Sequence, residues 1–291
     1  MIKRSMAPAL LGLILLAAAC AGARAADDPI HFLIIQPGSP GTTEEAAPLM
    51  ARLAEYLSTH SAGKPTVEGL YVNTLNDVER AIRKLQPRIA IVTLPYYLEQ
   101  RVRLGLRVQL ATRPGGRTED HYRLLVAATN PATSWEAVKG DVAGTLCFTA
   151  DAVARLLFQR PATALPFHCQ PTDRLLRAAR QVVQGELSGL LLTDEQYTSL
   201  QTLPEGKSLK ELHATPPLPP SLVVSFGTPD GGAKALTKTM VEMKNDPAAH
   251  DLLTELRTDG FEPIDPRRLT PLYDAFDQAG KGASKKGAPV K

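Results

Sequence analysis

Apolar positions follow two periods along the chain, one typical of buried strands and one typical of amphipathic helices. Continuous apolar runs at residues 30–36, 89–94, 106–112 and 122–129 indicate strands that are buried on both faces. Between these runs, residues 43–59 and 75–85 carry apolar side chains at helical spacing. Strands that alternate with helices predict an α/β fold, built on mainly parallel sheets that are flanked by helices.

The alternation restarts after Asn130-Pro131, with strands predicted at 143–147, 165–169 and 187–192 and helices at 151–160 and 173–184. A proline-rich segment at 215–220 then leads to a strand at 222–226. This late return of the chain predicts two lobes that are joined by two crossings, with a ligand-binding cleft between them. We assign residues 26–128 and 214–279 to lobe 1, and residues 129–213 to lobe 2.

The first 25 residues have the parts of a secretory signal peptide. Lys3 and Arg4 precede an apolar run at 7–19, and Ala23-Arg24-Ala25 forms a small-residue cleavage site. The run is shorter than the roughly 18–20 residues that a membrane span needs. Processing as a lipoprotein at Cys20 is an alternative to cleavage after Ala25. The sequence therefore predicts an exported protein.

Charge argues against a nucleic-acid partner. The formal charge of +3 includes three basic residues in the leader, which holds no acid, so residues 26–291 are formally neutral. Residues 280–291 contain four lysines and no acid, and their Gly/Ala/Ser/Lys composition predicts a disordered basic tail. The remaining body is then negatively charged, which does not suit binding to phosphate backbones.

Two cysteines, Cys147 and Cys169, remain after removal of the leader. Each ends a predicted strand of one βαβ unit, which would place the two sulfurs near the same ends of adjacent strands. In an oxidising compartment we expect a disulfide between them. Two buried free thiols are the alternative.

The common sequence signatures of enzymes and metal sites are missing. The chain has no Gly-x-Ser-x-Gly elbow, no Walker loop, no His-Glu-x-x-His and no Cys-x-x-Cys. None of the six histidines is spaced to share a helical face with another. We therefore expect neither enzymatic activity nor a metal or cofactor. An enzyme that uses one of the two cysteines as its nucleophile is the alternative.

Candidate ligand contacts lie where predicted strands lead into helices, because helix N-termini offer free N–H groups to an anion. Ser39 and Thr42 occupy the glycine-containing loop after the first strand, although Thr42 with Glu45 also forms a helix-capping pair. Tyr71 and Tyr96 lie at the ends of strands and are candidates for a cleft wall, with core packing as the alternative. In lobe 2, Thr149, Thr172 and Asp194 stand at predicted helix starts, where each is either a ligand contact or a cap.

Three segments carry a resemblance to a known family: RIAIVTLPYY at 88–97, AARQVVQGELSGLLL at 178–192 and LTELRTDGFEPID at 253–265. With the order of elements, they resemble periplasmic solute-binding proteins of the phosphate/phosphite/phosphonate ABC-transporter type over nearly the whole mature chain. The resemblance implies a type 2 periplasmic-binding fold, an α/β fold whose two lobes close by a hinge on a small polar or anionic solute. It further implies a monomeric periplasmic protein that delivers this solute to an ABC permease.

The family's ligand pocket would draw on Tyr71, Tyr96, Thr149, Thr172 and Asp194. This chain departs from the family at the second-lobe helix start, which reads Thr149-Ala150-Asp151-Ala152 instead of a Ser/Thr-rich turn. An aspartate in the first turn already occupies the positive end of the helix and would repel a dianion. An accessory or ligand-sensing subunit of a membrane complex, one that has lost transport, is therefore the alternative function.

Overall fold

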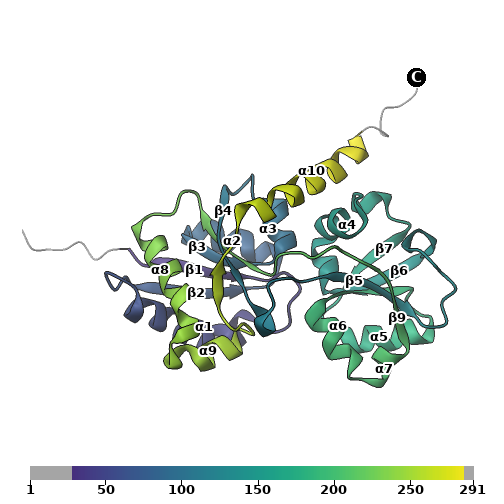
Figure 1. Cartoon of the computed structure of the whole chain (residues 1–291), viewed down its shortest axis with the longest axis horizontal. Helices are drawn as coiled ribbons and strands as arrows, with labels where there is room; N and C mark the ends of the chain where they lie inside the picture. The colour runs from purple at the N-terminus through teal and green to yellow at the C-terminus, as the bar shows by residue number, and fades with distance from the viewer. Residues whose placement is uncertain (1–27, 285–291) are drawn as a thin grey trace, which may run out of the picture.

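The computed structural model describes residues 28–284, which form two α/β lobes that lie side by side (Figure 1). Lobe 1 has a six-stranded sheet in the order β11-β4-β10-β3-β1-β2. Its strands are β1 (Ile30–Ile35), β2 (Val67–Val72), β3 (Ile89–Val92), β4 (Leu106–Thr112), β10 (Leu222–Phe226) and β11 (Phe261–Pro263). Its helices are α1 (Thr43–His60), α2 (Leu75–Leu85), α3 (Leu94–Gln100), α8 (Gly231–Glu242) and α9 (His250–Glu255).

Lobe 2 has a five-stranded sheet in the order β7-β6-β8-β5-β9. Its strands are β5 (Tyr122–Ala127), β6 (Gly140–Gly144), β7 (Phe167–Pro171), β8 (Gly189–Thr193) and β9 (Leu209–Ala214). A 3₁₀ segment, η3 (Thr145–Thr149), leads into α4 (Ala150–Phe158), and α5 (Leu175–Gln184), α6 (Asp194–Gln201) and α7 (Pro204–Lys207) complete the lobe.

Alternation along the strands explains why both faces of each sheet are covered by helices. In β1, Phe32 and Ile34 pack into an apolar cluster with α1, α8 and α9, while Leu33 and Ile35 pack on the opposite side with α2 and α3. The sheets are mainly parallel, and the strands that run against the rest are β10 and β11 in lobe 1 and β5 in lobe 2. The two-lobed α/β prediction is confirmed.

The lobes are linked at a hinge made of residues 113–121 and 215–221. The two segments pair there, since the backbone N–H of Asp120 donates to the carbonyl of Leu218 and the N–H of Leu218 donates to that of Asp120, both at 2.8 Å. The predicted lobe boundary at residue 128 is displaced, because β5 pairs with β8 and β9 in the second sheet. A strand that is apolar on both faces fits either sheet, so its sequence did not reveal its partners.

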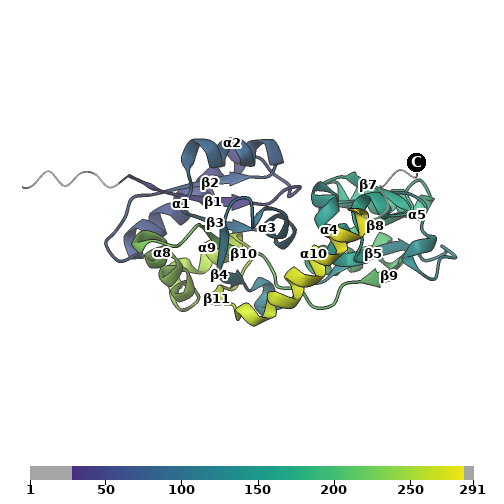
Figure 2. The same cartoon turned by 90° about the horizontal axis from the view of Figure 1, so that it is seen from above.

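A third connection is α10 (Thr270–Ser284), which extends from lobe 1 along the surface to α4 of lobe 2 (Figure 2). Residues 280–284, predicted to begin a disordered tail, belong to this helix. The reason is local packing, because Ala279 is buried and Gly280 lies against the guanidinium of Arg155. Residues 285–291 lie outside the described residues, as do the predicted leader and Cys20.

The expected disulfide is not formed, and Cys147 and Cys169 are free thiols. Cys147 lies in η3 instead of at the end of β6, and its Sγ donates to the carbonyl of Val142 at 3.5 Å. Cys169 lies in the neighbouring strand β7, where it stands opposite Val142 of β6 in the sheet. A hydrogen bond between the two sulfurs raises the pKa of the Cys147 thiol and lowers that of Cys169. The two thiols thus interact between η3 and β7 without being covalently bonded.

Residues 28–284 offer neither a candidate membrane span nor a candidate metal site. No helix in this range is both long and apolar enough to cross a membrane. Nor does the range contain a group of three or more His, Cys, Asp or Glu side chains that could hold a metal ion.

Candidate functional site

A cleft of about 480 Å³ lies between the lobes and is lined from both of them. Lobe 1 contributes the loop before α1, the start of α3 and the segment after α9. Lobe 2 contributes η3 and the start of α6, and the hinge closes one end. The polar residues that line the cleft are Gln36, Ser39, Thr42, Glu45, Tyr71, Thr93, Thr112, Arg117, Asp120, Tyr122, Thr145, Thr149, Thr193, Glu195, Gln196, Ser221, Glu255, Arg257 and Thr258.

The lobe 1 wall is built around the start of α1. Thr42 forms a capping box with Glu45, because its hydroxyl accepts from the Glu45 N–H at 3.1 Å while the Glu45 carboxylate accepts from the Thr42 N–H at 2.9 Å. The Tyr71 hydroxyl donates to the carbonyl of Pro40 at 3.3 Å, and burial raises the pKa of Tyr71. Thr93 precedes α3 and does not cap it, so its hydroxyl is available to the cleft.

The lobe 2 wall is held by a chain of hydrogen bonds from α6 to η3. The side-chain amide of Gln196 donates to the Thr145 hydroxyl at 2.8 Å, and its carbonyl oxygen accepts from the Thr193 N–H at 3.1 Å. Thr149 donates to the carbonyl of Leu146 at 3.4 Å and does not cap α4. These bonds fix three hydroxyl-bearing residues along one side of the cleft.

The lobes touch at the mouth of the cleft. Gly38 has a positive φ of 80°, and an added Cβ there would clash with the ring of Phe148 in η3. On another side, Arg257 of lobe 1 pairs with Glu195 of lobe 2 at 3.1 Å. The structure is therefore one in which the two lobes meet around the cleft.

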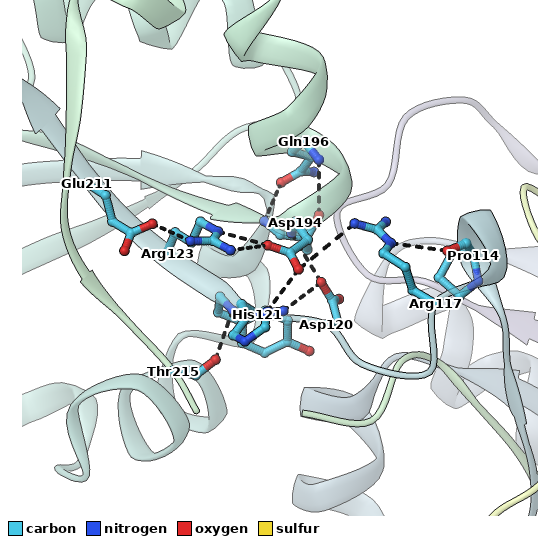
Figure 3. Close-up of polar contacts among 11 residues, drawn as sticks. Pro114, Arg117, Asp120, His121, Arg123, Asp194, Gln196, Glu211 and Thr215 are labelled. Atoms are coloured by element: carbon cyan, nitrogen blue, oxygen red, sulfur yellow. Dashed lines mark hydrogen bonds and ion pairs between the residues drawn. The ribbon is translucent and has the colours of Figure 1, made fainter. Parts of the chain in front are cut away.

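Asp194 is bound within a network at the hinge end of lobe 2 (Figure 3). Its Oδ1 accepts from Nε and Nη2 of Arg123 at 2.8 and 2.6 Å, and its Oδ2 lies 3.0 Å from Nδ1 of His121. Burial acts to raise the pKa of Asp194, but the hydrogen bonds from His121 and Arg123 outweigh it and lower the pKa. This carboxylate fixes the start of α6 against β5.

Asp120 and Arg117 place one charge of each sign beside the cleft at the hinge. Asp120 Oδ1 accepts from the backbone N–H groups of His121 and Asp194 at 2.9 and 3.1 Å, and burial raises the pKa of Asp120. Arg117 donates through Nε to the carbonyl of Pro114 at 3.2 Å, and its Nη1 lies 3.9 Å from Asp194 Oδ2. Since this ion pair is long and Asp194 is already shared with Arg123, the Arg117 guanidinium is the cation best placed to meet a ligand.

The structure brings together four of the candidate residues from the sequence, namely Ser39, Thr42, Tyr71 and Thr149, all of which line the cleft. Tyr96 is separate from them: it is 1% exposed in the lobe 1 core, where its hydroxyl has no partner among the described residues.

The two other candidates, Thr172 and Asp194, do not line the cleft. Thr172 lines another hollow, of about 290 Å³, and accepts there from the backbone N–H of Arg174 at 3.1 Å. The side chain of Asp194 is turned into the network with His121 and Arg123, although its neighbours Thr193 and Glu195 line the cleft.

Sequence reasoning missed Thr93, Thr145, Arg117 and Gln196 as cleft residues. Thr93 and Thr145 directly follow β3 and β6, so the strand-to-helix rule that selected Ser39 applied to them equally. Arg117 lies in a hinge segment without a periodic pattern, and Gln196 reads as an ordinary first-turn residue. Only their position in the fold marks these two.

Comparison with known families shows to which of them the chain belongs. The phosphonate-binding family model, described as the periplasmic substrate-binding protein of a phosphonate ABC transporter, matches residues 39–269. The chain belongs to this family. It is therefore a periplasmic substrate-binding protein of the ABC phosphonate transporter type and not an enzyme, as predicted. No curated protein matches the chain significantly.

Solved structures agree with the family in fold. A Xanthomonas citri protein bound to ATP is 16% identical with a TM-score of 0.68, over 86% of this chain and 98% of that one. A binding protein component of a phosphonate ABC transporter from Pseudomonas aeruginosa is 13% identical with a TM-score of 0.67, over 91% of each chain. PhnD1 of Prochlorococcus marinus, in complex with methylphosphonate, is 10% identical with a TM-score of 0.60, over 87% and 100%. At these identities the likeness shows the fold alone.

Proposed function

We propose that this phosphonate-binding family member captures a small polar solute with an anionic group, such as a phosphate or phosphonate, in the cleft between its lobes. Hinge motion closes the lobes on the solute, and the closed form delivers it to an ABC permease in the inner membrane. Arg117 is the observation that carries the proposal. Among the described residues, its guanidinium at the hinge side of the cleft makes a hydrogen bond to the Pro114 carbonyl and a long ion pair with Asp194, which Arg123 already binds, and Asp120 also interacts with it electrostatically.

Hydroxyl groups in the same cleft as Arg117 complete the expected anion contacts. Thr93 from lobe 1 caps no helix, and the Thr145 hydroxyl from lobe 2 accepts from Gln196 and keeps its own proton for a ligand. Hydroxyl donors combined with one guanidinium suit a phosphorus oxyanion, which accepts several charge-assisted hydrogen bonds. Two of the structural neighbours support this chemistry, since one holds methylphosphonate and the other ATP.

Thermal-shift measurements on residues 26–291, which contain every described element, test the proposal. The protein is refolded to remove carried-over ligand and screened against phosphate, phosphite, methylphosphonate, aminoethylphosphonate, sulfonates, amino acids and dicarboxylates. A ligand at 100 times its Kd stabilises the fold by about 2.7 kcal/mol, or several degrees in Tm. The Arg117→Ala variant should lose the shift, whereas Arg107→Ala, an exposed change on β4, should keep it.

A second candidate function is an accessory or ligand-sensing subunit that no longer transports. Asp151 in the first turn of α4 favours it, because this carboxylate stands at the helix start that faces the cleft. If no compound in the screen shifts the Tm while the refolded protein unfolds cooperatively, capture of a small anion is wrong and the accessory function is preferred.

A further inference from the structure

The start of α4 receives its cap from the other lobe. Thr149 makes no capping hydrogen bond, and the N–H of Ala152 in the first turn instead donates to the carboxylate Oε1 of Glu99 at 3.0 Å. Glu99 belongs to α3 of lobe 1, 53 residues earlier in the chain. A lobe 1 carboxylate therefore occupies the positive end of a lobe 2 helix.

A second carboxylate, that of Asp151, adds negative charge at the same helix end. Asp151 lies in the first turn of α4, where it pairs with Arg155 at 2.5 Å and accepts from the N–H of Ala162 at 3.1 Å. An external dianion at this helix start would face both Glu99 and Asp151. The chain has thus filled with its own side chains the position at which its family resemblance predicted a ligand.

Helix α10 packs over the same junction and contacts both lobes. Phe276 is 4% exposed, with the guanidinium of Arg101, which directly follows α3, and that of Arg155 from α4 at 5.5 and 5.1 Å from its ring centre. Arg101 also donates hydrogen bonds of 2.7 and 2.8 Å to the two carboxylate oxygens of Asp277 in α10. A further bond of 2.6 Å joins the hydroxyl groups of Tyr97 and Tyr273.

The contact between α3, α4 and α10 is part of the apolar core of the protein. Buried residues of lobe 1 and of lobe 2 belong to one apolar cluster, and Phe276 is a member of it. Opening the lobes at this edge would expose part of that cluster and break the bond between Glu99 and Ala152. The geometry is that of a fastening between the lobes, separate from the hinge segments.

We propose that Glu99 is an internal anion that holds α4 against α3, so that the lobes stay closed at this edge in the ligand-free protein, with α10 covering the contact. This clasp is defined by Glu99, the start of α4 and Phe276. It goes beyond ligand capture, does not depend on which solute the cleft binds, and limits the proposed hinge motion to the side of the cleft away from α3 and α4. A ligand would then bind toward Arg117 at the hinge, away from the start of α4.

Small-angle X-ray scattering and hydrogen exchange on refolded, ligand-free protein test the clasp. Four forms of residues 26–291 are compared: the wild type, Glu99→Ala, Glu99→Gln and the control Glu55→Ala, an exposed change on α1. Circular dichroism first establishes that each is folded. The Gln variant keeps the acceptor oxygen without its charge, whereas the Ala variant removes the acceptor.

The wild type should give the scattering curve of the closed structure, and Glu99→Ala should show a larger radius of gyration. Exchange at the Ala152 amide should quicken at least about tenfold in the Ala variant, the factor expected for loss of one hydrogen bond to a charged group. Glu99→Gln, which keeps the acceptor without the charge, should exchange at a rate between those of the wild type and Glu99→Ala, and Glu55→Ala should match the wild type in both measurements. A wild type that is already open, or an Ala variant with unchanged scattering and exchange, would overturn the clasp. Neither result bears on the ligand screen, so failure of the clasp and failure of the capture function remain distinguishable.

Discussion

The starts of α1 and α4 face the same cleft but are capped in opposite ways. At α1, Thr42 and Glu45 are three residues apart and satisfy each other's backbone N–H groups. At α4, the adjacent Thr149 makes no cap, and Glu99 reaches across from the other lobe. The first helix end is complete within its own lobe, whereas the second is complete only while the lobes are together. A helix end of the second kind couples local structure to the position of the lobes.

The largest effect is expected from Phe276→Ala, which removes the ring that lies between the two lobes' arginines. Truncation of a buried phenylalanine typically costs about 3–5 kcal/mol, and here it also uncovers the α3–α4 contact. Urea unfolding followed by circular dichroism measures the loss. Tyr273→Phe, which removes only one hydroxyl of the Tyr97–Tyr273 bond, should cost no more than about 1.5 kcal/mol. A Phe276 variant as stable as the Tyr273 variant would mean that α10 does not cover the junction.

Loss of the local cap of α1 should lower the stability by a smaller amount and leave the arrangement of the lobes unchanged. Thr42→Ala breaks the capping box and should lower the free energy of unfolding by about 1 kcal/mol. Because both partners belong to α1, the scattering curve should stay that of the wild type. An increase in the radius of gyration would show that α1 also takes part in holding the lobes together.

This contrast also separates what the sequence could predict from what it could not. The capping pair of Thr42 and Glu45 was readable because its partners are three residues apart, and apolar periodicity gave the two α/β lobes in the same way. Glu99 carried no signal, since its partner is 53 residues away and on another lobe. Contacts of this kind depend on how the lobes sit, which no local pattern encodes.

Two other differences between the sequence-based predictions and the structure have the same origin. Residues 122–129 were correctly predicted as a strand but were assigned to the wrong lobe, because apolar side chains on both faces do not specify neighbours. Tyr96 satisfied the rule for a cleft residue at a strand end, yet it is turned into the core of lobe 1. Sequence position selects the edge of a sheet, and the direction of the side chain is decided by packing.

The contribution of Glu99 to the stability of the protein should depend on pH. Burial raises the pKa of this carboxyl, with Asp151 of α4 raising it further and Arg155 of α4 opposing. The folded protein therefore binds the Glu99 proton more tightly than the unfolded chain does. The stability that this proton contributes is lost as the pH rises above 4.5, the ordinary pKa of a glutamate side chain. Relative to Glu99→Gln, the wild type should lose Tm as the pH is raised from below 4.5 to above it. A Tm difference that stays constant over this range would contradict burial of the charged group at the junction.

The smallest effect on stability is expected at the ion pair between Arg257 and Glu195. Arg257 and Glu195 also join lobe 1 to lobe 2, but their side chains are 72% and 49% exposed. An exposed pair gains little because water and salt screen it, so Glu195→Gln should change the free energy of unfolding by less than about 0.5 kcal/mol and leave the scattering unchanged. If Glu195→Gln opened the lobes as far as Glu99→Ala, the number of contacts between the lobes would matter more than their burial. The expected difference instead assigns closure to the one carboxylate that is bound at a helix end and covered by α10.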